Sequence, residues 1–133
     1  MKGWRARIGF LVPPGNPTVE PEMMELAPSG VSLHFTRMNA EGPAGTHTGQ
    51  EERNRSQVAS VPDCVKLLSM VSPHVIVMAH TATSYTLGQG LEATLVEQME
   101  ALSGARFITA FGSVLEALAH LGARQTASRR VRD

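Results

Sequence analysis

The stretch VIVMAHTATSYTLG, residues 75–88, decides the fold. It opens with the apolar run Val75–Ala79, which is short, rich in β-branched residues and preceded by Pro73. Such a run is typical of a strand buried on both faces, and strands of that kind occur in parallel sheets covered by helices. Five of the next six residues, His80–Tyr85, carry a polar group. Ligands bind at the carboxyl ends of strands in open α/β sheets, so we expect this polar cluster to line a site for a small polar molecule.

The rest of the chain alternates strands with helices. Apolar runs and period-two alternation predict further strands over residues 7–12, 31–38 and 106–110. Helical spacing of apolar residues predicts helices over residues 18–26, 60–71, 91–102 and 113–121. Residues 39–55 show no apolar periodicity and are expected to form a long loop, which could act as a lid or a binding loop. This alternation predicts an α/β fold with a flavodoxin-like parallel sheet flanked by helices.

Capping signals place the starts of three of these helices. Thr18 is a suitable N-cap for the first helix. Ser60 is expected to begin the second, with Pro62 in its first turn. Ser113 and Glu116 have the spacing of a capping box for the last one.

Length and composition limit the class of protein. The 133 residues suffice for one domain, which we place over residues 1–123, and the basic segment 124–133 (RQTASRRVRD) lacks a strand pattern and is expected to be disordered. The formal net charge of zero gives no electrostatic argument for nucleic-acid or membrane partners. No apolar run approaches the roughly 20 residues of a membrane span. The single cysteine, Cys64, excludes an internal disulfide and fits a cytoplasmic protein, and its place among apolar helix positions indicates a structural role.

His80 is the first candidate for chemistry. At the end of a central strand an imidazole can act as a general acid or base, or donate to a carboxylate. The alternative is a histidine satisfied by the backbone or by neighbouring hydroxyls, and the sequence does not separate the two. Thr81, Thr83 and Ser84 could donate hydrogen bonds to an anionic oxygen, although such residues also serve as ordinary turn and cap residues.

Asn16 and Tyr85 are expected near the same end of the sheet. Asn16 follows the first strand, and its amide can both donate and accept, which suits a carboxylate, although a plain turn between Gly15 and Pro17 is the alternative. Tyr85 offers a phenol there or closes the loop. Histidine and cysteine spacing does not match a zinc site. The pattern G-x-G-x-x-A over residues 88–93 does not directly follow a strand, so a nucleotide-binding protein ranks last. We therefore expect neither metal nor cofactor.

Three segments together resemble the aspartate/glutamate racemase superfamily, in particular its maleate cis-trans isomerase and arylmalonate decarboxylase branches. They are IGFLVPPGNPTVEPEM from residue 8, VIVMAHTATSYTLG from residue 75 and FITAFGSVLEALAHLGAR from residue 107. The resemblance implies that Asn16 binds a substrate carboxylate and that His80 occupies the position of the first catalytic cysteine. It implies a pocket built from Pro14, Asn16 and the run Thr81, Ala82, Thr83, Ser84 and Tyr85.

The resemblance also implies one half of a two-domain, pseudo-symmetric fold, because members are about twice as long and carry a second catalytic cysteine in the latter half. The leading hypothesis is therefore a cofactor-independent isomerase, racemase or decarboxylase, nearest to a maleate isomerase, that acts next to a carboxylate on a small acid. A truncated or frame-shifted gene product would explain the length and the absent cysteine. The alternative is a non-catalytic half-domain that binds small carboxylates, with a homodimer supplying the second half by symmetry.

Overall fold

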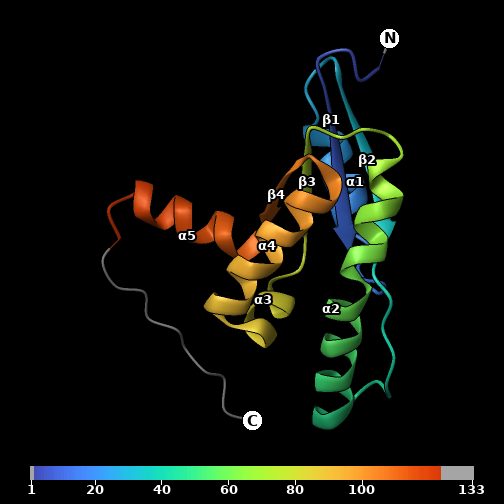
Figure 1. The fold of residues 1–133 in the computed structure, drawn as a ribbon, viewed down its shortest axis with the longest axis vertical. Coiled ribbons are helices and arrows are strands. Elements are labelled where there is room, and N and C mark those ends of the chain that lie inside the picture. Colours follow the sequence, from blue (N-terminus) through green and yellow to red (C-terminus); the bar gives the residue numbers. More distant parts are fainter. Residues whose placement is uncertain (1, 124–133) are drawn as a thin grey trace.

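The computed structural model describes residues 2–123, which fold around one four-stranded parallel sheet (Figure 1). The strands are β1 (Ala6–Val12), β2 (Val31–Arg37), β3 (Val75–Met78) and β4 (Arg106–Thr109). Their order in the sheet is β2-β1-β3-β4, and each neighbouring pair is parallel. The predicted α/β class and parallel sheet are therefore confirmed, and β2 lies at an edge as its alternating pattern suggests.

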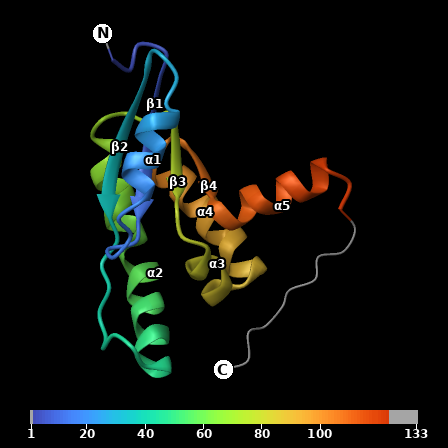
Figure 2. The same cartoon turned by 180° about the vertical axis from the view of Figure 1, so that it is seen from behind.

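Five helices accompany the sheet. They are α1 (Val19–Leu26), α2 (His47–Ser69), α3 (Thr81–Leu87), α4 (Gln89–Ser103) and α5 (Ala110–His120). Helices α2 and α4 cover one face of the sheet, and α1 lies on the opposite face (Figures 1 and 2). Helix α5 leaves β4 and extends away from the body of the molecule, and none of its residues is buried (Figure 2).

The hydrophobic core lies between the sheet and the helix pair α2 and α4. Its central strands contribute Leu11, Ile76 and Met78, all of which are fully buried. Helix α2 supplies Val61 and Val65 from positions that recur at helical spacing. Burying each such side chain contributes about 1.5–3 kcal/mol, so this face holds the sheet together. The core is completed by Met38, Cys64, Leu68, Leu95, Met99, Ala105 and Phe107.

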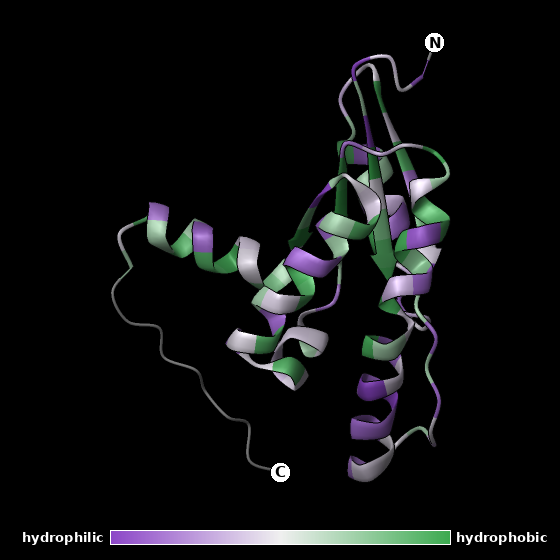
Figure 3. Cartoon of the chain, in the orientation of Figure 1, coloured by the Kyte–Doolittle hydropathy of each residue, from purple (hydrophilic) through white to green (hydrophobic). Residues whose placement is uncertain are grey.

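Helix α2 is the main departure from the predicted elements. It begins at His47, whereas the sequence predicts a loop over residues 39–55 and a helix start at Ser60. Thr46 is the N-cap, and its side chain accepts a hydrogen bond from the Gly49 amide at 3.1 Å. The added turns are hydrophilic nearly all round and project beyond the sheet (Figure 3). An apolar stripe is absent because these turns pack on little of the core, so periodicity could not reveal them.

Two further helix starts differ from the predictions. Residues 81–87 form helix α3 instead of a loop, and Gly88, with φ of 74°, joins it to α4. The G-x-G-x-x-A pattern therefore follows a helix, which no dinucleotide fingerprint does. Helix α5 begins at Ala110 with Thr109 as N-cap, accepting from the Gly112 amide at 2.9 Å. Ser113 is not the cap, since its hydroxyl donates to the Thr109 carbonyl at 3.0 Å.

The predicted basic tail over residues 124–133 lies outside the described residues. Within residues 2–123, no helix combines the length and the apolar character needed to cross a membrane.

Gly49 gives a test of the extended α2. Alanine is usually better than glycine in a helix by about 1 kcal/mol. A Cβ at Gly49, however, would lie 2.1 Å from the Pro43 carbonyl oxygen, so we expect Gly49→Ala to lower the free energy of unfolding by about 1–3 kcal/mol. Gly90→Ala is the matched control, because a Cβ at Gly90 in α4 meets open space. Chemical denaturation measures both, and equal stabilisation by the two substitutions would contradict the observed start of α2.

Candidate functional site

The central strands β1 and β3 deliver two of the predicted segments to one edge of the sheet. Leu11 pairs with Met78 in the parallel register, and the Ala79 amide donates to the Leu11 carbonyl at 2.9 Å. Immediately beyond this point lie the turn Pro13–Asn16 on one strand and His80 on the other. We call this end of the sheet the carboxyl edge. The two strands therefore carry the predicted carboxylate-binding residue and the predicted imidazole to the same edge.

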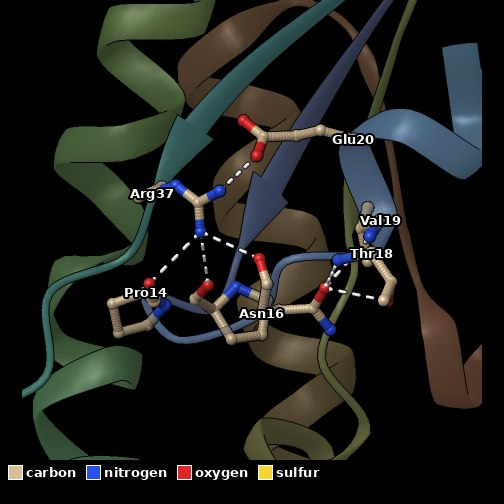
Figure 4. Close-up of polar contacts among 7 residues, drawn as sticks. Pro14, Asn16, Thr18, Val19, Glu20 and Arg37 are labelled. Atoms are coloured by element: carbon tan, nitrogen blue, oxygen red, sulfur yellow. Dashed lines mark hydrogen bonds and ion pairs between the residues drawn. The ribbon is translucent and has the colours of Figure 1, made fainter.

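The side chain of Asn16 is half committed to the fold. Its Oδ1 accepts from the Thr18 amide at 2.9 Å, the Val19 amide at 3.0 Å and the Thr18 hydroxyl at 3.2 Å (Figure 4). These bonds satisfy first-turn groups of α1 that lack intrahelical partners. Among residues 2–123, Nδ2 of Asn16 has no hydrogen-bond partner. The sequence allows this amide to donate or accept, and the structure leaves it as a donor only.

His80 stands at the N-cap position of α3 and is half-buried. Its Nδ1 lies 2.7 Å from the hydroxyl oxygen of Thr83, which is fully buried. Burial lowers the pKa of His80 below its ordinary value because the charged form loses hydration. At neutral pH the ring is therefore uncharged, Thr83 fixes its orientation, and Nε2 is left for other contacts.

The other predicted site residues differ in how far their side chains are exposed. Ser84 is buried and its hydroxyl donates to Glu92 Oε1 at 2.6 Å, so this hydroxyl packs α3 against α4. Tyr85 is exposed, and its ring meets that of Phe111 edge-on with centroids 4.9 Å apart. Thr81 is exposed at the start of α3, next to His80, and Ala82 is half-buried.

A cavity of about 390 Å³ adjoins the polar face of α3. One wall comes from α3 and the other from the projecting turns of α2. Its lining residues are Glu51, Asn54, Arg55, Ala82, Tyr85 and Thr86. The sequence interpretation missed the α2 wall because it assigned these residues to a loop. The signal was Thr46, a preferred N-cap type, followed by the good helix formers Gln50, Glu51 and Glu52.

Pro14 and Cys64 do not line this cavity. The carbonyl of Pro14 accepts from Arg37 Nη1 at 3.2 Å, so Pro14 contributes main chain to the edge of the sheet. Cys64 is buried in α2, and burial raises the pKa of its thiol, which confirms its predicted structural character. A larger hollow, of about 670 Å³, borders Cys64 and Arg37, and none of the predicted pocket residues lines it. The described residues contain no group of three or more side chains placed to hold a metal ion.

Comparison with known proteins gives a consistent result. Residues 8–130 match the family model for arylmalonate decarboxylase. Maleate cis-trans isomerase from Nocardia farcinica, solved with TRIS bound, is 26% identical, with a TM-score of 0.73 over 88% of this chain and 49% of that chain. A liganded mutant of arylmalonate decarboxylase is 25% identical, with a TM-score of 0.69 over 88% and 47%. No curated protein sequence matches the chain significantly.

A further solved structure shares the fold at lower identity. The maleate isomerase of Pseudomonas putida, solved with maleate, is 21% identical, with a TM-score of 0.72 over 88% of this chain and 49% of that chain. The chain thus spans about half the length of the solved structures that it matches.

The lowered pKa of His80 has a measurable consequence for stability. An unfolded chain takes up the His80 proton at about pH 6.5, whereas the folded chain does so only at lower pH. The contribution of the uncharged His80 ring to the free energy of unfolding is therefore fully present above about pH 6.5. It is lost as the pH falls through the folded pKa. We expect wild type to lose more stability than His80→Gln between pH 7 and pH 5, measured by denaturation at each pH. A His80 midpoint at or above 6.5 in an NMR titration would contradict the assignment.

Proposed function

The chain belongs to the arylmalonate decarboxylase family, and from that membership we propose that it binds a small carboxylic acid at the carboxyl edge of the sheet. We propose further that it takes part in cofactor-independent chemistry next to a carboxylate, nearest to that of a maleate isomerase. Racemisation and decarboxylation belong to the same class of reaction. The likeness to a maleate isomerase at 26% identity supports this choice of substrate class.

The proposal depends on one observation, which is how the side-chain amide of Asn16 is hydrogen-bonded. Its oxygen accepts from the Thr18 and Val19 amides at the start of α1, which leaves Nδ2 as a donor without a partner among residues 2–123. A carboxylate accepts hydrogen bonds only, so a fixed amide donor is the matching group. Because hydrogen bonds to charged groups contribute about 1.5–3 kcal/mol, this donor alone would add substantially to the affinity.

Thr81 and His80 supply the neighbouring contacts in this proposal. The exposed hydroxyl of Thr81 donates to the second carboxylate oxygen, and the uncharged ring of His80 faces the adjacent carbon through Nε2. Donors aimed at the carboxylate favour the enolate-like state that forms when a proton or carbon dioxide leaves that carbon. The same state forms when a nucleophile adds to the double bond of maleate; rotation about the new single bond and departure of the nucleophile then give fumarate. His80 acts as the proton-transfer group, and its lowered pKa keeps the ring in the unprotonated form that can accept a proton.

A complete reaction needs a second group on the opposite face of the substrate. We propose that a further domain provides it, and the resemblance to the racemase superfamily implies a cysteine in that role. Asn16, Thr81 and His80 then form the carboxylate-holding half of the site. We also propose a cytoplasmic location, which the free thiol of Cys64 supports.

A second candidate is a binding half-domain that pairs with another copy of itself. The observation in its favour is that Val114 and Leu115 of α5, and Leu121 at its C-cap, are exposed although they are apolar. A second copy packed there would cover them. Binding of maleate without turnover, together with a dimer in sedimentation analysis, would favour this candidate over the enzyme.

Maleate provides the direct test of the proposed function. We expect the chain to bind maleate in a calorimetric titration and to shift the amide signals of residues 13–18 and 80–84 in NMR spectra. Proton NMR of a maleate solution then shows whether fumarate forms. Absence of binding by maleate, arylmalonates and dicarboxylic amino acids alike would refute the proposal.

Asn16→Asp separates the two functions of the side chain. An aspartate carboxylate can accept the same hydrogen bonds from the Thr18 and Val19 amides, so we expect the free energy of unfolding to stay within about 0.5 kcal/mol of wild type. The donor becomes a carboxylate that repels the ligand, so the maleate dissociation constant should rise about ten- to a hundredfold. Asn16→Ala is the comparison variant and should lose both binding and stability. Unchanged maleate affinity in Asn16→Asp would remove Asn16 from the site.

A further inference from the structure

We propose that Arg37 is a positioning residue that fixes the turn carrying Asn16, an inference that rests on the proposed function. Its Nη1 donates to three main-chain carbonyls of that turn (Figure 4). The distances are 3.2 Å to Pro13, 3.2 Å to Pro14 and 3.1 Å to Asn16. A single guanidinium nitrogen thus binds three carbonyls of the segment between β1 and α1.

The main chain of Arg37 is itself held from two sides. Arg37 is the last residue of β2 and pairs with Val12, the last residue of β1. The amide of the next residue, Met38, donates to the Val12 carbonyl at 2.9 Å. From α2, the thiol of Cys64 donates to the Arg37 carbonyl at 3.6 Å. The guanidinium therefore extends from a backbone position that β1 and α2 hold in place. Its contacts fix the turn relative to the sheet.

Glu20 completes the arrangement from α1. Its carboxylate pairs with Arg37 Nη2, so the guanidinium contacts both the turn that carries Asn16 and helix α1 (Figure 4). The planar guanidinium can serve carbonyls with one nitrogen and a carboxylate with the other, which a lysine ammonium cannot do in the same geometry. Since Glu20 balances the charge and the carbonyls occupy Nη1, Arg37 acts through Asn16 and does not bind the ligand carboxylate itself.

The first experiment needs no ligand. Hydrogen exchange of the Thr18 and Val19 amides reports the bonds to Asn16 Oδ1 directly. We expect Arg37→Gln to accelerate their exchange about two- to tenfold, and Arg37→Lys to restore part of the protection. Glu20→Gln keeps the three carbonyl contacts and should have the smaller effect. Arg106→Gln, at an exposed residue of the edge strand β4, is the control for a general loss of charge. Unchanged exchange in Arg37→Gln would overturn the proposal.

The second experiment is a double-mutant cycle read by the maleate dissociation constant. Arg37→Gln alone should raise this constant about two- to tenfold, whereas in the Asn16→Asp background it should add nothing further. Fully additive effects would show that Arg37 acts on the ligand independently of Asn16 and would overturn the proposal. Failure of wild type to bind maleate, arylmalonates and dicarboxylic amino acids alike would refute the proposed function alone, because the exchange measurement still decides whether Arg37 fixes the turn.

Discussion

The parallel pairing of β1 with β3 is the constraint on which the rest of the structure depends. It buries Leu11, Ile76 and Met78 against α2 and α4, and the same register sets where both strands end. A slip by one residue would turn the core side chains to the other face. A slip by two residues would move the Asn16 turn relative to His80 by about 6.6 Å along the strands. Core packing and the composition of the candidate site are therefore fixed by the same hydrogen bonds.

The sequence predicts the elements that bury apolar side chains and fails where burial is slight. The strands over residues 7–12 and 75–79 are continuous apolar runs, and the structure places both at the centre of the sheet. The first turns of α2 expose polar side chains on nearly every side, so nothing in their periodicity distinguishes them from a loop. Helix α3 is short, and five of its seven residues are threonine, serine or tyrosine, whose intrinsic preference for helix is weak. Its packing on α2 and α4 overrides that preference.

For the candidate site, the sequence indicates which residues lie at the carboxyl edge but not which of their atoms are available. The oxygen of Asn16 is used by α1, and the hydroxyl of Ser84 is used by Glu92, eight residues further along the chain. Such commitments depend on how helices meet, which no local pattern encodes. Arg37 shows the same limit, because its contacts lie more than twenty residues away at Pro13 and Pro14. Family resemblance supplied the residue types, and only the assembled fold supplies their donors and acceptors.

The buried thiol of Cys64 is a natural reporter of the contact between α2 and the sheet. It is the one cysteine of the chain, and its side chain is shielded where α2 packs on the sheet. Burial raises the pKa of the thiol, so the reactive thiolate is scarce while α2 stays in place. We therefore expect the thiol to be alkylated more slowly in the native protein than in the unfolded chain. Faster alkylation under destabilising conditions would then report loosening of the contact between α2 and the sheet, at a residue that the protein already carries.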